Sequence, residues 1–234
     1  MEDMKDIERK VLRQFNKGCT QYGMLEDGDR IVVALSGGKD SMTLARLMAG
    51  RARIFRPRIE VAAVHVVMDN VPYVSDLEYL ESYCSELGIT FHVVHASFDE
   101  STDPRKTRCF LCAHYRRKAL FDFAKDNQYN KVALGHHQDD ILVTALMNMT
   151  FEGNADTMRP VLALNHWPLR VIRPLCLVRE EWIRQVSAEI REQTVSCPYE
   201  SKTRRQDMER VFQHLERLNP EARYSLWHAL LEKQ

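Results

Sequence analysis

The sequence contains no apolar stretch long enough to cross a lipid bilayer and no excess charge of either sign. Its apolar runs are short, as in Val61-Ala62-Ala63-Val64, whereas a transmembrane helix needs about 20 apolar residues. Its first residues, Met1-Glu2-Asp3-Met4-Lys5, are mixed and acidic, unlike the basic start of a secretory signal peptide. With 33 basic and 33 acidic residues, the formal net charge is zero, so the whole molecule does not favour a polyanionic partner. We therefore expect a cytoplasmic protein with no membrane segment.

The sequence also lacks internal repeats, low-complexity tracts and linkers rich in Pro, Gly or Ser. A length of 234 residues with 44% hydrophobic residues suits one large domain with a sizeable core. Expected strands at 31–35, 59–67, 90–94, 131–134 and 171–172 alternate with helical patterns at 41–48, 74–87, 111–126 and 139–149. This alternation predicts an α/β fold with a doubly wound parallel sheet. The expected divisions are an N-terminal helical extension (1–28), the α/β domain (29–178) and a C-terminal helical segment (179–234), with residues 151–168 irregular.

Six residues between the first expected strand and the next helix carry the strongest signal, Ser36-Gly37-Gly38-Lys39-Asp40-Ser41. Two adjacent glycines allow a sharp turn and let backbone N–H groups approach an anion without a Cβ in the way. The following helix directs the positive end of its dipole to the same place, which favours phosphate binding. The string is shorter than the Walker loop Gly-x-x-x-x-Gly-Lys-Ser/Thr. With an aspartate embedded in it, the loop indicates pyrophosphate release with a metal ion rather than transfer of the terminal phosphate.

This string resembles the signature of the PP-loop ATP pyrophosphatases. The resemblance implies a doubly wound parallel sheet and cleavage of ATP between its α and β phosphates, with adenylation of a substrate oxygen that later leaves with AMP. An ordinary turn between strand and helix, in which glycines and a capping Asp or Ser are common, is the alternative. The nucleotide is expected to contact Leu35, Ser36, Gly37, Gly38, Lys39, Asp40, Ser41, His65, Gly135 and Asp139. Asp40 is also an expected catalytic residue.

A second acidic motif, Gly135-His136-His137-Gln138-Asp139-Asp140, follows the expected strand 131–134. Open α/β sheets bind ligands at the carboxyl ends of their strands, where this motif falls. Two aspartates at a helix start are equally explained as caps that interact with the helix dipole. Beside a phosphate loop, Asp139 and Asp140 are expected to hold Mg²⁺ on the pyrophosphate, and Asp140 to take part in catalysis. The adjacent histidines lack metal-binding spacing, so no zinc site is expected from them.

Of six cysteines, only Cys109 and Cys112 are closely spaced, as Cys-x-x-Cys. A disulfide framework is not expected in a chain of this size without a secretory signal, so the pair indicates a metal site or a redox dithiol. Cys197, followed by a proline as in some iron–sulfur ligand runs, is the remaining candidate. Three thiolates would bind three of the four irons of a cubane cluster, and zinc is the alternative metal. The other three cysteines are interpreted as buried apolar residues.

Further segments occur in the same order as in the tRNA 2-thiocytidine synthetases, a family within the PP-loop class. These segments are 24–31, the cysteine pair followed by Arg116 and Arg117, 133–142, 172–175 and the late Cys197. The chain resembles this family over nearly its whole length, from residue 5 to residue 232. The resemblance implies that ATP, Mg²⁺ and a [4Fe–4S] cluster are used to replace the C2 oxygen of an anticodon-loop cytidine in tRNA with sulfur.

The resemblance also implies that Cys109, Cys112 and Cys197 ligate the cluster and leave one iron open. Glu200 stands where many relatives have a further cysteine, and the long tail of some relatives is absent. An iron without a protein ligand can hold deprotonated sulfide for attack on C2. Arg116, one helical turn after Cys112, is an expected catalytic residue that stabilises the adenylate, with a solvated helix arginine as the alternative. The sulfur would come from a donor such as a cysteine desulfurase or from free sulfide.

Basic residues gather at three places despite the zero net charge. The segments 105–118 and 202–205 are expected to bind tRNA phosphates, together with a single arginine near the last strand. The expected RNA-binding residues are Arg105, Lys106, Arg108, Arg117, Lys118, Arg173, Lys202, Arg204 and Arg205. The third cluster, four arginines between residues 51 and 58, is interpreted as a solvated face.

Three other functions fit parts of the sequence. Another PP-loop tRNA modifier, such as a 2-thiouridine synthetase, would use the same motifs on another base. A lysidine-type ligase would need no cluster. A non-enzymatic iron–sulfur or zinc protein that binds RNA would produce no AMP. The sequence also leaves open a homodimer through the terminal helices.

Overall fold

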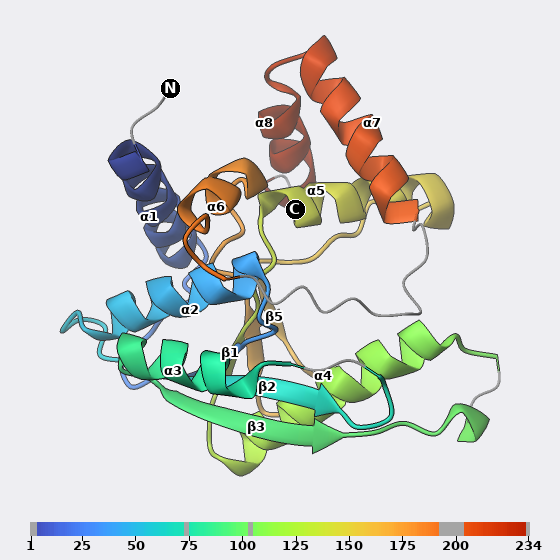
Figure 1. Ribbon diagram of the computed structural model, residues 1–234. Helices are drawn as coiled ribbons and strands as arrows, with labels where there is room; N and C mark the ends of the chain where they lie inside the picture. The colour runs from blue at the N-terminus through green and yellow to red at the C-terminus, as the bar shows by residue number, and fades with distance from the viewer. Residues whose placement is uncertain (1–3, 73–74, 103–104, 192–203, 233–234) are drawn as a thin grey trace.

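The protein is an α/β structure, shown in Figure 1 as a computed structural model that describes residues 4–72, 75–102, 105–191 and 204–232. Its sheet has the strand order β3-β2-β1-β4-β6-β5. The central strand β1 (Arg30–Ala34) lies between β2 (Glu60–Met68) and β4 (Lys131–Ala133), and all three are parallel. β3 (Thr90–Ala96) and β6 (Arg170–Ile172) extend the sheet in parallel on the two sides. The predicted α/β fold with a mostly parallel sheet is confirmed.

The segment 151–168, expected to be irregular, contains one more strand. β5 (Val161–Ala163) pairs antiparallel with β6 at the sheet edge, with Val161 opposite Ile172. A π-helical turn, η2 (Asn148–Glu152), also extends the end of α5. The expectation was wrong here because three residues are too few to show a strand period, and the strand exists through its pairing with β6.

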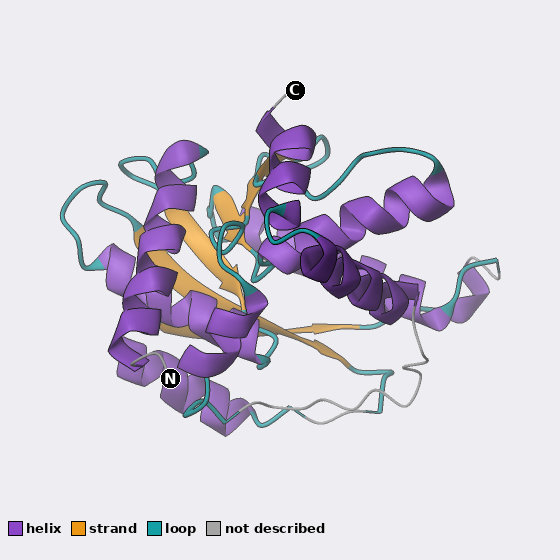
Figure 2. Cartoon of the chain, turned by 90° about the horizontal axis from the view of Figure 1, so that it is seen from above, coloured by secondary structure: helices purple, strands orange, loops and turns teal. Residues whose placement is uncertain are grey.

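Helices cover both faces of the sheet (Figure 2). Successive side chains of β1 point to opposite faces of the sheet. Ile31 and Val33 belong to one hydrophobic core, and Val32 belongs to the other. The first core packs against α1 (Met4–Gln21), α2 (Lys39–Ala52), α3 (Leu77–Leu87), α5 (Gln138–Met147) and α6 (Glu180–Val186). The second packs against α4 (Arg108–Asp126). The sheet is therefore doubly wound, as predicted.

The terminal helices are part of the first core. Phe15 of α1, Phe212 of α7 (Arg204–Leu218) and Trp227 of α8 (Ala222–Trp227) are buried there together with residues of β1. Short turns η1 (Glu100–Thr102) and η3 (His228–Glu232) complete the described elements. Within the described ranges, no helix combines the length and the apolar character that a membrane span requires.

A buried ion pair joins β4 to the segment before β1. The side chains of Lys131 and Asp29 are each 2% exposed, and the Lys131 Nζ lies 2.7 Å from the Asp29 Oδ2. The same Nζ donates to the Met24 carbonyl at 3.1 Å, and the Asn130 side chain donates to the Asp29 Oδ1 at 2.8 Å. Because both side chains are buried, removing Lys131 would leave the Asp29 carboxylate without a counter-charge, whereas Lys131 also pairs with the Glu26 Oε2 at 3.2 Å.

We expect Lys131→Met to lower the free energy of unfolding by about 3 kcal/mol, because it strands the Asp29 carboxylate in the interior. Lys118→Met is the matched control, since Lys118 forms an exposed pair with Asp122 at 2.7 Å. The control should change the free energy of unfolding by less than about 0.5 kcal/mol. Denaturant unfolding of both variants measures the difference, and equal effects would contradict a structural role for the buried pair.

Candidate functional site

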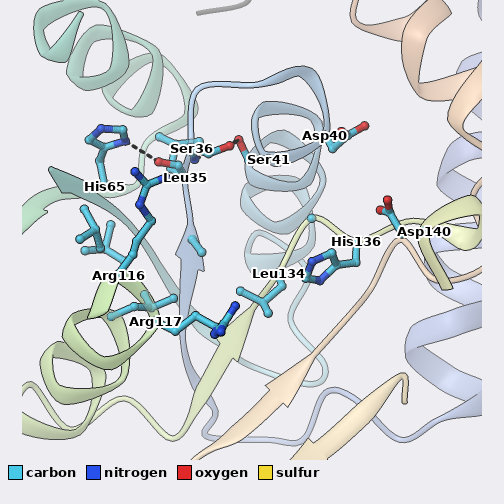
Figure 3. A pocket seen from close by; sticks show the side chains of 15 residues that line it. Leu35, Ser36, Asp40, Ser41, His65, Arg116, Arg117, Leu134, His136 and Asp140 are labelled. Atoms are coloured by element: carbon cyan, nitrogen blue, oxygen red, sulfur yellow. Dashed lines mark hydrogen bonds between the residues drawn. The ribbon is translucent and has the colours of Figure 1, made fainter. Parts of the chain in front are cut away.

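A cavity of about 410 Å³ opens at the carboxyl ends of β1, β2 and β4 (Figure 3). After β1 the chain continues to β2 and β3 on one side, whereas β4, β6 and β5 lie on the other side. The strand order thus reverses between β1 and β4, and open α/β sheets bind ligands at such a switch point. The walls come from the loop after β1, from β2, from α4 and from the loop after β4.

The loop 36–41 is held in shape by its own serines. The Ser36 N–H donates to the Ser41 Oγ at 3.1 Å, and the Ser41 Oγ donates to the Gly38 carbonyl at 3.0 Å. Gly37 has a φ of +90°, which residues with a Cβ rarely adopt. Helix α2 begins directly after Gly38, so its first N–H groups have no intrahelical acceptor and its positive dipole end lies here. The loop has the geometry of an anion site.

The loop after β4 touches the start of α2 through a glycine. A Cβ on Gly135 would lie 3.1 Å from the Ser41 backbone nitrogen and 3.2 Å from the Asp40 carbonyl carbon. Both are backbone atoms, so a larger residue would displace the loop 36–41 instead of a flexible side chain. Gly135, expected as a nucleotide contact, therefore sets the spacing between two walls of the cavity.

Charged groups at the start of α2 are paired across elements. The Lys39 Nζ lies 3.1 Å from the Asp40 Oδ2 and 3.1 Å from the Oε1 of Glu180 at the start of α6. Burial opposes the charge of Lys39, but the two carboxylates outweigh this effect and raise its pKa, so the amine is protonated at neutral pH. Glu180 was not predicted from the sequence, and it couples the C-terminal segment to the loop.

Asp40 has one carboxylate oxygen with no protein partner. Burial raises the pKa of Asp40, against the charges of His137 and Lys39. Its Oδ1 is buried and makes no hydrogen bond within the described residues, and the His137 Nε2 lies 3.8 Å away. Burying a carboxylate oxygen without a hydrogen-bond partner costs free energy. Such an oxygen is a suitable ligand for a cation.

The adjacent aspartates at the start of α5 have different neighbours. The Asp140 Oδ2 accepts from the His137 N–H at 2.8 Å, which completes a capping box. The Asp140 Oδ1 pairs with Arg205 of α7, and Asp140 lines the cavity. The structure thus brings Asp140 to Asp40 and the phosphate loop.

Asp139 lies away from the cavity lining. Its Oδ1 accepts from Arg223 of α8 at 2.7 Å, and its Oδ2 accepts from the Glu180 N–H at 2.9 Å. Burial would raise the pKa of Asp139, but the hydrogen bond and charge of Arg223 lower it. Since protein groups hold both oxygens, the arrangement argues against the expected binding of nucleotide and magnesium by Asp139. It ties α5 to α6 and α8 instead.

His65 and Leu35 form one wall of the cavity. His65 is buried, and its Nδ1 donates to the Leu35 carbonyl at 2.7 Å while its Nε2 accepts from the Ser75 hydroxyl at 2.8 Å. Burial lowers the pKa of His65, and the nearby charge of Arg116 acts in the same direction. A neutral imidazole with the proton on Nδ1 therefore fixes the Leu35 carbonyl at the cavity wall.

His136 also lines the cavity and is held by Arg173. The Arg173 Nε donates to the His136 Nδ1 at 3.4 Å, so the ring proton lies on Nε2. Burial lowers the pKa of His136 to about 4, and the charges of Arg173 and Arg205 add to this effect. Arg173 is itself buried and donates to the Arg159 carbonyl at 2.5 Å. The buried Arg173 guanidinium thus positions His136, and its expected contact with RNA stays a prediction that this burial does not favour.

Helix α4 connects the cysteine pair to the cavity. Thr107 is its N-cap, and Cys109 (exposed) and Cys112 (half-buried) lie in its first turns. Arg116, one turn later, donates to the Cys112 Sγ at 3.9 Å and lines the cavity together with Arg117 (Figure 3). The helix starts three residues earlier than predicted, so both cysteines belong to it. The described part of the chain contains no group of three or more His, Cys, Asp or Glu side chains that could hold a metal.

The remaining expected RNA contacts lie around α4 and α7. The exposed ones in the described ranges are Arg105, Lys106, Arg108, Lys118 and Arg204. Arg205 is half-buried by its pairing with Asp140 and with Glu209. Cys197 and Lys202 lie outside the described residues.

The chain is similar to known proteins along nearly its whole length. The PP-loop domain family matches residues 4–191. The chain is 32% identical to tRNA-cytidine(32) 2-sulfurtransferase 1 of Francisella tularensis (strain WY96-3418) over 237 residues, which covers 98% of this chain and 88% of that protein. It is 33% identical to the tRNA-cytidine(32) 2-sulfurtransferase of Geotalea daltonii, with coverages of 97% and 93%. The chain belongs to the PP-loop family.

A solved structure agrees with this fold. U34-tRNA thiolase NcsA from Methanococcus maripaludis, determined with its [4Fe-4S] cluster, superposes with a TM-score of 0.81 at 24% identity. The superposition covers 99% of this PP-loop chain and 80% of that one. At this identity, the likeness establishes the fold.

Three contributors to this PP-loop site escaped the sequence reasoning: Glu180, Arg223 and the Arg173–His136 contact. Glu180 and Glu181 open α6, and acidic residues in a first turn are explained by the helix dipole alone. Arg223 lies 84 residues from Asp139 in the chain, so no local spacing connects them. The packing of α6 against α2, of α8 against α5, and of Arg173 against the loop after β4 reveals these roles.

We expect Gly38→Ala to raise the Kd for ATP at least ~10-fold while leaving the thermal stability unchanged. A Cβ on Gly38 would meet only the Ser36 Oγ at 3.7 Å, so the fold accepts it, but it enters the turn where the N–H groups of the PP-loop face an anion. Gly50→Ala, inside the helix that follows Gly38, has nothing within 4 Å of the added Cβ and is the control. The control should leave the Kd unchanged and stabilise α2 by about 0.5–1 kcal/mol. Calorimetric titration showing equal ATP affinities would contradict a phosphate site here.

We expect the free energy of unfolding to fall as the pH drops from 6.5 to 4, partly because of His136. Its ordinary pKa is 6.5 and its folded pKa is about 4, so in this window the unfolded chain binds more protons than the folded one. The His136 contribution is roughly 3 kcal/mol in total. Denaturation at several pH values should show a weaker dependence in His136→Gln and an unchanged one in the exposed control His214→Gln. Identical curves for the wild type and His136→Gln would disprove this assignment.

Proposed function

We propose that this protein is an ATP-dependent tRNA thiolase that replaces the C2 oxygen of an anticodon-loop cytidine with sulfur. The position of Arg116 carries the proposal, since it contacts the Cys112 sulfur at 3.9 Å and lines the cavity beside the phosphate loop. A nucleotide bound at the phosphate loop and a sulfur centre at the start of α4 would therefore both lie next to Arg116. The names of the sequence relatives, tRNA-cytidine(32) 2-sulfurtransferases, support this substrate.

ATP would bind with its phosphates at the start of α2. The N–H groups of the loop 36–41 and the helix dipole stabilise negative charge there. Lys39 is protonated and adds a positive charge, which Glu180 and Asp40 hold in place before the nucleotide arrives. Leu35 and His65 line the same cavity and would face the adenosine.

Magnesium would be held by Asp40 and Asp140. The partnerless Oδ1 of Asp40 fits a cation, and both carboxylates line the cavity. Mg²⁺ on a nucleotide commonly uses one or two protein carboxylates plus phosphate oxygens and water, so a third protein ligand is not required. To bind the metal, Asp140 must then break its ion pair with Arg205.

The cysteines fit an iron–sulfur centre by their chemistry and spacing. Cys109 and Cys112 lie three residues apart on one helix, the first exposed and the second half-buried beside Arg116. With Cys197, they would hold a [4Fe–4S] cluster and leave one iron without a protein ligand. When bound, such a cluster supplies a Lewis acid that keeps sulfide deprotonated.

The reaction would consist of two substitutions. The cytidine O2 attacks the α-phosphorus of ATP, and pyrophosphate leaves with the electrons of the broken P–O bond. Hydrosulfide then attacks C2, its proton is lost, and the original O2 departs as part of AMP. Arg116 would stabilise the negative charge on the adenylate. Neutral His136, with its proton on Nε2, offers a hydrogen bond from the cavity wall without adding charge.

Transfer RNA would approach across the exposed basic residues at the start of α4 and α7. Arg117 lines the cavity and is exposed, so it would bind a phosphate beside the target base. Sulfide would be supplied free or by a cysteine desulfurase. A homodimer and a cytoplasmic location stay predictions from the sequence.

We expect Cys109→Ala and Cys112→Ala to lose bound iron and to lower the yield of thiolated cytidine at least ~100-fold, while ATP still binds. The control is Cys84→Ala, because Cys84 of α3 is buried in the first hydrophobic core, whereas Cys112 packs against the second core on the other face of the sheet. The assay uses anaerobically purified full-length protein, a tRNA transcript, ATP, Mg²⁺ and sulfide. Mass spectrometry of the nucleosides and iron analysis give the readouts. Full thiolation by both cysteine variants would refute the assignment.

The same assay separates the alternative functions. Thiolated uridine in place of cytidine would indicate a 2-thiouridine synthetase. RNA-dependent AMP formation by iron-free protein, without thiolation, would indicate a lysidine-type ligase. Absence of AMP with every tRNA would indicate a non-enzymatic RNA-binding protein.

A further inference from the structure

The segment 51–58, which comprises the end of α2 and the loop that leads to β2, carries four arginines at the amino ends of the strands, opposite the cavity. In Figure 1 this loop lies at the left, whereas the arrowheads of β2 and β3 point to the right. It follows α2, whose 14 residues start at the phosphate loop. At 1.5 Å per residue the helix is about 21 Å long, so the two loops are separated by roughly this distance.

We call the segment 51–58 the arginine loop. The guanidinium groups of its four arginines have no carboxylate partners within the described residues. The guanidinium groups contact backbone carbonyls and an aromatic ring, and the Arg58 backbone N–H donates to the Asp27 Oδ1 at 2.7 Å. The Arg51 Nη2 donates to the Arg56 carbonyl at 3.1 Å, and the Arg53 Nη2 donates to the Leu87 carbonyl at 3.0 Å. Arg56 and Arg58 are exposed. The four guanidinium groups are therefore not neutralised by ion pairs within the described residues, and the Asp27 carboxylate lies beside the Arg58 backbone, in a molecule whose formal net charge is zero.

The basic residues around α4 differ in this respect. Arg108 lies 2.5 Å from a Glu100 carboxylate oxygen, and Lys118 lies 2.7 Å from Asp122. These pairs neutralise part of the charge near the cysteine pair. The arginine loop is thus the less neutralised of the two clusters, although the sequence favoured a solvated face for it.

The arginine loop also exposes apolar side chains. Phe55 is 79% exposed and Ile54 is 51% exposed, and Phe55 has the largest exposed fraction of the large hydrophobic residues in the described ranges. The Arg56 guanidinium lies 6.0 Å from the Phe55 ring centre. An aromatic ring among arginines provides a surface on which an unpaired base can stack.

A hollow of about 470 Å³ adjoins the loop. Arg53, Arg30, Tyr129 and Glu60 are among its lining residues. The Arg30 guanidinium lies 5.2 Å from the Tyr129 ring centre, and its Nε pairs with Glu60 at 2.9 Å. The hollow thus has a mixed polar and apolar lining, in which Glu60 neutralises Arg30 and Arg53 has no carboxylate partner within the described residues.

We infer that the arginine loop is a second RNA contact, at which Arg56 and Arg58 bind phosphates of the transfer RNA and Phe55 stacks on an unpaired base. Guanidinium groups pair with phosphates in bidentate geometry, and they are more weakly hydrated than ammonium groups. An RNA whose target base lies in the cavity must extend about 21 Å to reach the loop, so it is contacted beyond the modified nucleotide. The inference rests on the proposed function, which makes transfer RNA the substrate.

The test uses Arg56→Gln/Arg58→Gln in the full-length protein. Arg51 and Arg53 are left in place because they hold backbone carbonyls. We expect the Kd for a full-length tRNA transcript to rise about tenfold, and the slope of log Kd against log salt concentration to fall by about 1 to 2. Phe55→Ala should also weaken binding about tenfold, but with an unchanged salt slope, since stacking releases no counterions. Arg9→Gln/Arg13→Gln removes the same charge from exposed positions of α1 and should change neither quantity.

Unchanged tRNA affinity and salt slope in both loop variants would overturn the inference. If the wild type still forms AMP with tRNA in that case, the proposed function stands and only the second contact is lost. If the wild type forms no AMP with any tRNA, the proposed function fails, and the binding data alone decide whether the loop contacts RNA. Sedimentation that shows wild-type dimers, converted to monomers by Phe55→Ala with unchanged tRNA binding, would assign the loop to a second copy of the chain and overturn the inference.

Discussion

The contact between the loop after β1 and the loop after β4 is the constraint on which the rest of the site depends. Gly135 approaches the backbone of Asp40 and Ser41 so closely that a Cβ would lie 3.1 Å from a backbone nitrogen. This approach exists because β1 and β4 are paired neighbours although β2, β3 and four helical segments separate them in the chain. The N–H groups of the loop are thereby fixed before any ligand arrives, and such preorganised dipoles stabilise charge without rearranging.

The ion pairs around this contact come from the C-terminal third of the chain. Glu180 holds Lys39, Arg205 holds Asp140, and Arg223 holds Asp139. Helices α6, α7 and α8 therefore set the charge distribution of a loop that lies near the N-terminus. One consequence is chemical. Of two adjacent aspartates, Asp139 is held by protein groups away from the cavity, whereas Asp140 lines the cavity and is held there by Arg205 and by the His137 backbone.

Helix α4 brings a different chemistry to the same cavity. Its first turns carry the thiols, and the next turn carries the arginine that contacts both a thiol and the cavity. A helix is a rigid spacer with 3.6 residues per turn, so Cys112 and Arg116 must lie on one face. This arrangement places a cysteine thiol and the cavity wall within reach of one arginine side chain.

The sequence alone determined the order of strands and helices, the phosphate loop and the cysteine pair. Each of these depends on local chemistry: strand and helix periods, glycine conformations, and the spacing of two thiols. Tertiary structure decided which aspartate reaches the cavity, why Arg173 is buried against His136, and that Val161–Ala163 forms an edge strand. In each case the partner comes from a separate element, 84 residues away for Arg223 and Asp139. A side chain's role is then set by what packs against it, and no local pattern encodes that neighbour.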